Sequence, residues 1–327
     1  MSAMAKTLDR AFALEAVRVT EAAAIAAANQ IGRGDEHAAD QAAVEAMRAA
    51  FNALPIQGTV VIGEGERDEA PMLFIGEKVG SGGVAVDIAL DPLEGTTLTA
   101  KALPNALAVM AIAEPGTLLN APDTYMDKIA VGPGYKEGII DLDASPGDNI
   151  IALAEAKGVK PRGITALVLD RPRHAHIIDG VRKTGAAVRL ITDGDVAGVI
   201  ATTDPATGID IYMGQGGAPE GVLAAAALRC VGGQIQTRLV FRNEEERTRA
   251  RRLGITDFNR KYKLHDLASG DVIFAATGVT DGSMLSGVHR TGTHITTESI
   301  VMRSATGTVR WVRARHNKAR HQKSHGD

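Results

Sequence analysis

The segment spanning residues 84–97 constrains the fold most strongly, because it joins an apolar run to a turn that carries two carboxylates and two hydroxyls. Residues 84–90 alternate large and small side chains and are rich in β-branched residues, which predicts a buried strand. Pro92 should end that strand, since proline cannot donate to the ladder, and Gly95 permits close backbone approach. Asp91 and Glu94 can therefore face one point.

Two carboxylates in this position are typical of a metal-dependent phosphatase site. Mg²⁺ and Mn²⁺ prefer carboxylate and carbonyl oxygens, and the Thr96 hydroxyl, two residues after Glu94, could hold a water beside them. The alternative is an acidic turn followed by a capped helix, because Asp, Pro, Gly and Thr are ordinary turn residues.

Other apolar runs also end in polar turns, which favours an α/β organisation with ligands gathered at the strand ends. Residues 59–62, 106–113, 164–169 and 188–191 are predicted strands. Apolar residues at helical spacing predict two amphipathic helices over residues 8–23 and 44–54. We place a lobe boundary near residue 160. A glycine-rich loop over residues 214–221 precedes a predicted helix over 222–231, so its backbone N–H groups could bind an anion.

Composition excludes several functions. A net charge of −3 and 3% aromatic residues provide neither the basic field nor the rings for nucleic-acid or membrane-surface binding. No uncharged apolar stretch approaches the about 18 residues of a membrane span, and no signal-peptide core is present. The single Cys230 is expected to be a packed helical thiol, which fits a cytoplasmic protein. The basic segment 313–327 lacks an apolar face and is predicted to be disordered; metal binding by its histidines is a minority alternative.

Six motifs in order resemble class II fructose-1,6-bisphosphatase over residues 6–315. They are Gly32-Arg33-Gly34-Asp35, Ile62-Gly63-Glu64-Gly65-Glu66, residues 91–97, Arg171-Pro172-Arg173-His174, Asp193-Gly194-Asp195 and Gly216-Gly217-Ala218-Pro219-Glu220-Gly221. The resemblance implies a layered α/β/α/β/α sugar-phosphatase fold related to lithium-sensitive inositol monophosphatases. It also implies hydrolysis of the 1-phosphate of fructose 1,6-bisphosphate by metal-activated water, in gluconeogenesis or carbon fixation. One departure is Arg171, where the family has Lys, so donor geometry there can differ.

The same resemblance implies how the site is divided. An N-terminal metal-binding lobe would cover residues 1–160, and a substrate-binding lobe residues 161–312. The implied ligands of Mg²⁺ or Mn²⁺ are Asp35, Glu64, Asp91, Glu94 and Glu220. On its own, Asp35 would sooner cap the second helix, and Glu220 would favour a helix N-terminus even without a metal. The Leu93 carbonyl is a further candidate ligand.

Thr96 is implied to orient the attacking water. Glu66 and Asp68 are weaker candidates for assisting it, since surface solvation explains each equally well. Arg171 and Arg173 suit the second phosphate by forked, charge-assisted hydrogen bonds, although Arg-Pro-Arg-His alone would sooner be an exposed basic turn. The substrate-binding residues implied by the resemblance are Glu94, Gly95, Thr96, Tyr125, Arg171, Pro172, Arg173, Asp193, Gly194, Asp195 and Gly217.

Three alternatives to this function stay open. The enzyme could also act on sedoheptulose 1,7-bisphosphate, or it could have the specificity of an inositol phosphatase on the same metal core. A non-enzymatic phosphosugar or nucleotide sensor is disfavoured, because sensing phosphate needs donors more than metal ligands, and the glycine-rich loop lacks both nucleotide-binding patterns. The resemblance further implies a homo-oligomer, either a dimer or a tetramer.

Overall fold

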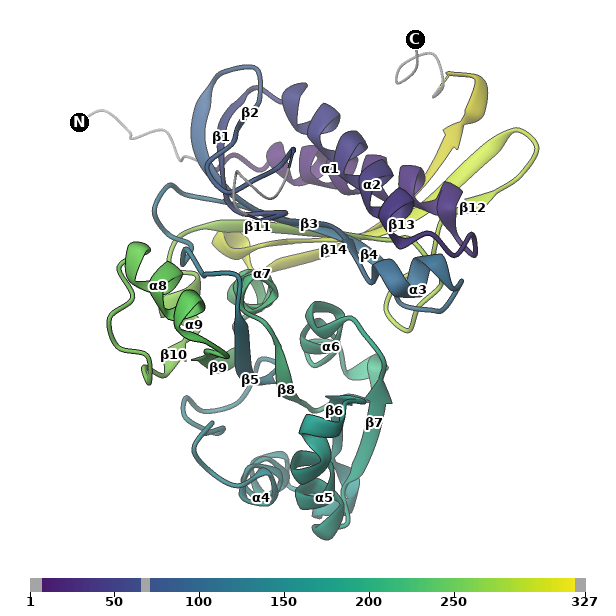
Figure 1. Ribbon diagram of the computed structural model, residues 1–327. Coiled ribbons are helices and arrows are strands. Elements are labelled where there is room, and N and C mark those ends of the chain that lie inside the picture. The colour runs from purple at the N-terminus through teal and green to yellow at the C-terminus, as the bar shows by residue number, and fades with distance from the viewer. Residues whose placement is uncertain (1–7, 66–70, 321–327) are drawn as a thin grey trace.

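The computed structural model describes residues 8–65 and 71–320, in which two β-sheets alternate with three layers of helices (Figure 1). The predicted α/β/α/β/α order is thereby confirmed, whereas the relation to inositol monophosphatases stays a prediction. Of the helices described, none is long and apolar enough to cross a membrane.

The first sheet lies between the N-terminal helices and the middle layer. Within the described ranges it has eight strands, ordered β12-β13-β11-β4-β3-β1-β2 with β14 also paired to β13. The β1–β3 pair is parallel, and the pairs from β3 through β4, β11 and β13 to β14 are antiparallel. The strands are β1 Ile56–Ile62, β2 Lys78–Val79, β3 Val84–Glu94, β4 Leu107–Ala113, β11 Val272–Gly278, β12 His289–Arg290, β13 His294–Arg303 and β14 Thr308–Asn317.

Helices α1, Phe12–Ala27, and α2, Glu36–Asn52, cover the outer face of this sheet. Both confirm the predicted amphipathic pattern. Val44, Met47 and Phe51 of α2 are buried in one cluster with residues of the sheet such as Ile88. This cluster packs against β3, the strand that carries Asp91 and Glu94. The N-terminal helices therefore position the site but contribute few of its residues.

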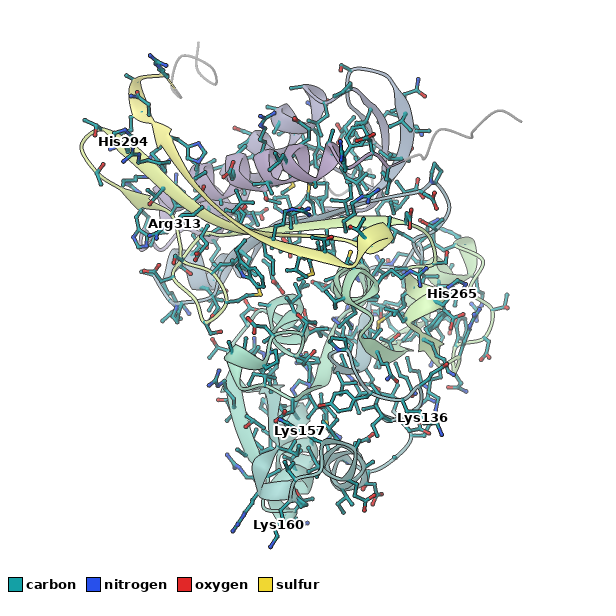
Figure 2. All side chains as sticks on the ribbon, turned by 180° about the vertical axis from the view of Figure 1, so that it is seen from behind. Lys136, Lys157, Lys160, His265, His294 and Arg313 are labelled. Atoms are coloured by element: carbon teal, nitrogen blue, oxygen red, sulfur yellow. The ribbon has the colours of Figure 1, made fainter. Side chains whose placement is uncertain are left out.

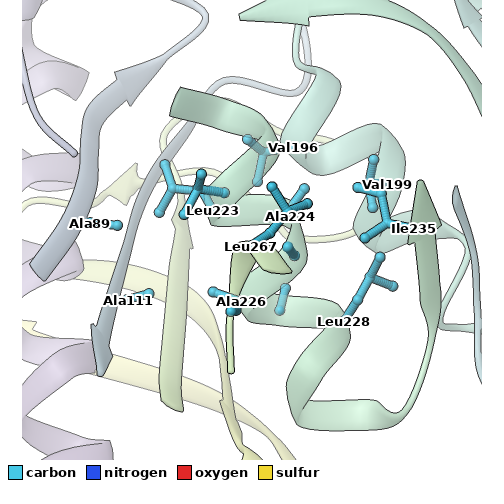
Figure 3. Packing of buried hydrophobic residues seen from close by; sticks show 14 of the residues in the cluster. Ala89, Ala111, Val196, Val199, Leu223, Ala224, Ala226, Leu228, Ile235 and Leu267 are labelled. Carbon is cyan, nitrogen blue, oxygen red and sulfur yellow. The ribbon is translucent and has the colours of Figure 1, made fainter. Parts of the chain in front are cut away.

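The middle layer is built around α7, Ala218–Val231, and half of its buried residues are alanine. Leu223 faces Ala89 of the first sheet, whereas Leu228 lies beside Ile235 of the second (Figure 3). Short alanine side chains let both sheets approach one helix closely. The thiol of Cys230 is buried in α7 and donates to the Ala226 carbonyl, which confirms the predicted packed thiol.

In the described residues the second sheet has six strands, ordered β10-β9-β5-β8-β6-β7. The strands are β5 Tyr125–Val131, β6 Thr165–Leu169, β7 Ala187–Ile191, β8 Ile211–Gly217, β9 Gln234–Val240 and β10 Tyr262–Lys263. Helices α4, Pro146–Lys157, and α5, Ala175–Lys183, form the outer layer against it. Shorter elements are α3 Thr96–Ala100, α6 Asp195–Ala201, α8 Glu244–Arg252, α9 Leu264–Leu267, η1 Ala28–Gln30, η2 Pro161–Gly163, η3 Pro172–His174, η4 Pro205–Thr207 and η5 Ser304–Thr306.

The chain crosses between the sheets more than once, so residue 160 does not separate the strands of the first sheet from those of the second. Strand β5, before that point, belongs to the second sheet, while β11, β13 and β14 return to the first. The prediction of disorder from residue 313 is wrong up to Asn317, because β14 pairs along its whole length with β13. Arg313, opposite Glu298, projects from this outer strand (Figure 2).

Candidate active site

A cavity of about 560 Å³ lies between the two sheets at the ends of several strands. The first sheet contributes Glu64, after β1, and Asp91 and Glu94, at the end of β3. The middle layer contributes Glu220 in the first turn of α7, and the second sheet contributes Tyr125 at the start of β5. The cavity therefore gathers residues that lie far apart along the chain.

The end of β3 places its two carboxylates through a β-bulge. Asp91 pairs with Val109 and Glu94 with Leu107, so β3 carries one extra residue between these two positions. Pro92 lies in this bulge and does not end the strand as the sequence suggested. Gly95 follows with a φ of 92°, a conformation that favours glycine, and α3 begins directly after it at Thr96.

Each of these carboxylates has one anchored oxygen. Asp91 Oδ1 accepts from the backbone N–H of Leu93 at 3.0 Å, and Glu94 Oε1 accepts from Val196 N–H at 2.7 Å. Within the described residues, Glu94 Oε2 is buried and has no hydrogen-bond partner, and the same is true of Glu220 Oε2. Such atoms are costly unless something pairs with them, and a cation is a suitable partner.

Burial, together with the neighbouring carboxylates, raises the pKa values of three acids in the cavity. Burial, followed by the neighbouring carboxylates, raises the pKa of Asp91 well above its usual value. Burial and then Asp195 raise the pKa of Glu94 in the same direction. Burial, Asp40 and Glu220 raise the pKa of Glu64 to about 8. Divalent cations would favour the ionised forms, because they supply the missing positive charge.

The carboxylate oxygens of the cavity are ligands of the type that hard cations such as Mg²⁺ and Mn²⁺ prefer, but they are not arranged as a complete coordination site. Within the described ranges, no three Asp, Glu, His or Cys side chains lie close enough together to coordinate one metal ion. The buried oxygens of Glu94 and Glu220 that lack a hydrogen-bond partner in the described residues nevertheless fit a divalent cation.

Glycines allow Glu220 and its surroundings to pack at the start of α7. A Cβ atom on Gly217 would collide with the Glu220 carboxylate, and one on Gly216 would collide with the Asp195 carboxylate. Asp195 forms a buried ion pair with Lys128 of β5. The glycine-rich turn is thus needed for close packing around two acidic groups.

Arginine side chains also line the cavity. The guanidinium carbon of Arg173 lies 5.1 Å from the centroid of the Tyr125 ring, and Arg173 Nη2 donates to the Gln215 carbonyl at 2.9 Å. His174 anchors this turn: its Nδ1 bonds the Leu169 carbonyl at 2.7 Å, and its Nε2 accepts from Gln215 N–H at 2.9 Å. The basic turn is therefore held against the second sheet.

Most of the predicted site residues line the cavity. They are Glu64, Asp91, Glu94, Gly95, Thr96, Tyr125, Arg171, Arg173, Asp193, Gly194, Asp195, Gly217 and Glu220. Leu93 lines it as well, whereas Pro172 begins η3 and is not among the lining residues. Glu66 and Asp68 lie outside the described residues.

Asp35 is not brought to the cavity. Its Oδ1 accepts from Ala38 N–H at 2.9 Å, so it caps α2, which is the alternative that the sequence left open. Asp40, one turn further along α2, lines the cavity instead, and burial raises its pKa. Sequence reasoning missed Asp40, which resembles an ordinary polar position of an amphipathic helix.

Arg242 was also missed, although it lines the cavity from the turn between β9 and α8. The neighbouring sequence signal, Asn243 followed by three glutamates, indicates only a capped helix. The structure confirms this cap, because Asn243 Oδ1 accepts from Glu246 N–H at 2.9 Å. No local pattern indicates that the preceding arginine meets Tyr125.

Comparison with known proteins gives consistent results along nearly the whole chain. A family model described as bacterial fructose-1,6-bisphosphatase, glpX-encoded, matches residues 10–316. Fructose-1,6-bisphosphatase 1 class 2 of Escherichia coli strain K12 is 46% identical over 324 residues, covering 94% of this chain and 96% of the relative. Fructose-1,6-bisphosphatase class 2 of Shigella flexneri is similar to the same extent, with the same coverage.

Proposed function

Because this chain belongs to the bacterial class 2 fructose-1,6-bisphosphatase family, we propose that it hydrolyses fructose 1,6-bisphosphate to fructose 6-phosphate and phosphate. One observation carries the proposal: a single cavity is lined both by the carboxylates of Glu64, Asp91, Glu94 and Glu220 and by the guanidinium groups of Arg171, Arg173 and Arg242. A sugar bisphosphate suits this mixed lining, provided that cations cover the carboxylates.

We propose Mg²⁺ or Mn²⁺ as the cofactor. The residues proposed to hold it are Glu64, Asp91, Glu94 and Glu220. When bound, a divalent metal supplies positive charge that acidifies the attacking water and stabilises the leaving oxygen. The unpartnered oxygens of Glu94 and Glu220 support this assignment.

The chain's own residues would orient both reactants. Thr96 is proposed to hold the attacking water through its hydroxyl, because its position follows Glu94 and Gly95 at the start of α3. Threonine is not proposed as the nucleophile, since it has no identified base. Asp193 and Asp195 are proposed to lie near the sugar, where Asp193 could accept hydroxyl hydrogen bonds.

Arg171, Arg173 and Tyr125 are proposed to bind the phosphate that is not cleaved. Forked guanidinium donors match phosphate geometry, and the stacking of Arg173 over Tyr125 supports their acting together. The cytoplasmic location, expected from the single cysteine, and the homo-oligomeric state, implied by the family resemblance, stay predictions.

Phosphate release tests the proposal directly. The purified protein would be assayed with fructose 1,6-bisphosphate, sedoheptulose 1,7-bisphosphate and inositol 1-phosphate, each with Mg²⁺, Mn²⁺ or EDTA. We expect turnover of fructose 1,6-bisphosphate with either metal and none with EDTA. Preference for inositol 1-phosphate, or full activity in EDTA, would contradict the proposal. The sedoheptulose arm decides whether the specificity is dual.

A further inference from the structure

Two arginines that lie far apart in the sequence both contact one aromatic ring. The guanidinium carbon of Arg242 lies 4.7 Å from the centroid of Tyr125, and that of Arg173 lies 5.1 Å from the same centroid. Both distances are within the range of cation–π attraction. All three residues line the cavity, so its wall carries a guanidinium pair that is organised by Tyr125.

A buried carboxylate fixes Arg242. Glu246 is 1% exposed, and its Oε1 accepts from Arg242 Nε at 2.6 Å and pairs with Nη2 at 2.5 Å. Its Oε2 accepts from the backbone N–H of Arg242 at 2.8 Å and lies 2.8 Å from the Thr124 hydroxyl. The Arg242 side chain is thus held at the first turn of α8 although it is 54% exposed.

This pairing leaves Arg242 able to bind an anion. The contacts with Glu246 use Nε and Nη2, whereas a guanidinium group has five N–H donors. Its charge persists at every relevant pH. An arginine that is preorganised loses less side-chain entropy on binding than a free surface arginine. Arg242 therefore combines cavity access, fixed orientation and spare donors.

We propose that Arg242 is a specificity-determining residue that binds the uncleaved phosphate of a sugar bisphosphate together with Arg173, and that Glu246 is its positioning residue. The inference deepens the proposed function and rests on it. A phosphate dianion carries two negative charges, and the carboxylates that line the same cavity repel it. Arg242 and Arg173, which both lie against the Tyr125 ring, supply two positive charges on the cavity wall.

The test uses Arg242→Ala, Arg242→Lys and Glu246→Gln, with Arg247→Ala as the control. Arg247 lies on α8, which begins just after Arg242; it is 44% exposed and pairs with Glu244, but it does not line the cavity. Each Mg²⁺-loaded protein would be assayed on fructose 1,6-bisphosphate and on fructose 1-phosphate, which lacks the second phosphate. Binding of fructose 6-phosphate to each protein would be measured by calorimetry.

For Arg242→Ala we expect KM for the bisphosphate to rise about 10- to 100-fold, as for loss of a charge-assisted hydrogen bond. Its kcat should stay within about twofold, because the contact is made equally in the ground and transition states. Fructose 6-phosphate should bind more weakly by a similar factor, and kinetics on fructose 1-phosphate should hardly change. Arg242→Lys should be intermediate, Glu246→Gln should raise KM less than Arg242→Ala, and Arg247→Ala should match wild type.

Wild-type KM for the bisphosphate in Arg242→Ala would overturn the inference, and so would equal losses on both sugars. If Glu246→Gln fails to fold, the two Arg242 variants still test the inference. The wild-type Arg242 side chain is half exposed, so its replacement should leave the fold intact. Failure of the proposed function is a separate outcome: wild type would then release no phosphate from the bisphosphate. The calorimetric comparison would still show whether Arg242 binds the sugar phosphate.

Discussion

The carboxylate of Glu94, at the end of β3, accepts a 2.7 Å hydrogen bond from the backbone N–H of Val196 in the first turn of α6. This bond joins the first sheet to the middle layer directly at the cavity. It satisfies only one oxygen of Glu94, and the other is buried without a hydrogen-bond partner in the described part of the chain. The energetics of the site depend on what occupies that second oxygen.

Glu94→Gln and Asp91→Asn should separate stability from activity. Turnover should fall by at least about 100-fold, because a lost ligand charge removes part of the several kcal/mol that a metal contributes. The metal-free variants should resist thermal unfolding at least as well as metal-free wild type, since one buried like charge is gone. Circular dichroism melts in EDTA and phosphate-release assays in Mg²⁺ measure the two effects. A folded variant with wild-type kcat would remove its residue from the proposed centre.

Thr96 tests the positioning of water. Thr96→Ser should keep much of the activity, because it retains the hydroxyl, and Thr96→Ala should lose about 100-fold or more, within the range for proton-transfer groups. Thermal unfolding should be similar in both variants. If Thr96→Ala has the kinetics of wild type, the residue serves only the start of α3.

Asp35 tests the difference between a cap and a ligand. Asp35→Ala should lower the free energy of unfolding by about 1 kcal/mol, the usual effect of losing an N-cap, and Asp35→Asn should retain most of that stability. Urea denaturation in EDTA measures this effect. Calorimetric titration of Asp35→Asn with Mn²⁺ gives the independent readout. A stable Asp35→Asn protein with weakened Mn²⁺ binding would restore the ligand role that the family resemblance implies.

Stability without metal should fall as pH rises. The pKa of Glu64 is about 8 in the folded protein, against a usual 4.5, so the folded state holds a proton that the unfolded state has released. Stability from this group is present below about pH 4.5 and is lost progressively up to about pH 8, by about 1.4 kcal/mol for each pH unit at most. Urea unfolding in EDTA at pH 5.5, 7 and 8.5 would measure the slope.

The matched control for that slope is Glu64→Gln, which cannot titrate and should flatten it. Saturating Mg²⁺ should also flatten the slope in wild type, because a cation favours the ionised carboxylate. An identical slope in wild type and Glu64→Gln would assign the pH dependence to other groups.

The local sequence pattern was sufficient to predict the strand and the helix that carry Asp91, Glu94 and Glu220. The predicted strand that leads to Asp91 exists, although it continues to Glu94, and the helix predicted over 222–231 exists, although it begins earlier, at Ala218. Alternation and turn chemistry act within a few residues, so a local pattern can indicate such elements. Arg242 and Asp40 could not be recognised in this way. Their place in the cavity depends on how β9 and α2 pack against elements remote in sequence, and this packing leaves no signal in their neighbours.

The basic C-terminal strand shows a different limit of sequence reasoning. The segment 313–327 is rich in basic residues and lacks an apolar face, which indicated disorder. The structure pairs residues 313–317 with β13 at the edge of the first sheet, where one neighbour supplies the backbone hydrogen bonds and the arginines face outward. Edge strands commonly carry such charges, since they discourage pairing with other molecules.

The alanine-rich α7 has a consequence for substrate length. Asp91 and Glu94 belong to the first sheet and Tyr125 belongs to the second, and α7 with α6 fills the space between the sheets. The alanine methyl groups of α7 therefore help to set the separation between the two sheets. We expect a bulkier side chain at Ala224 or Ala226 to increase that separation, and with it the distance from Asp91 and Glu94 to Tyr125. A preference for a longer sugar could thus arise from substitutions of buried residues that do not contact the substrate.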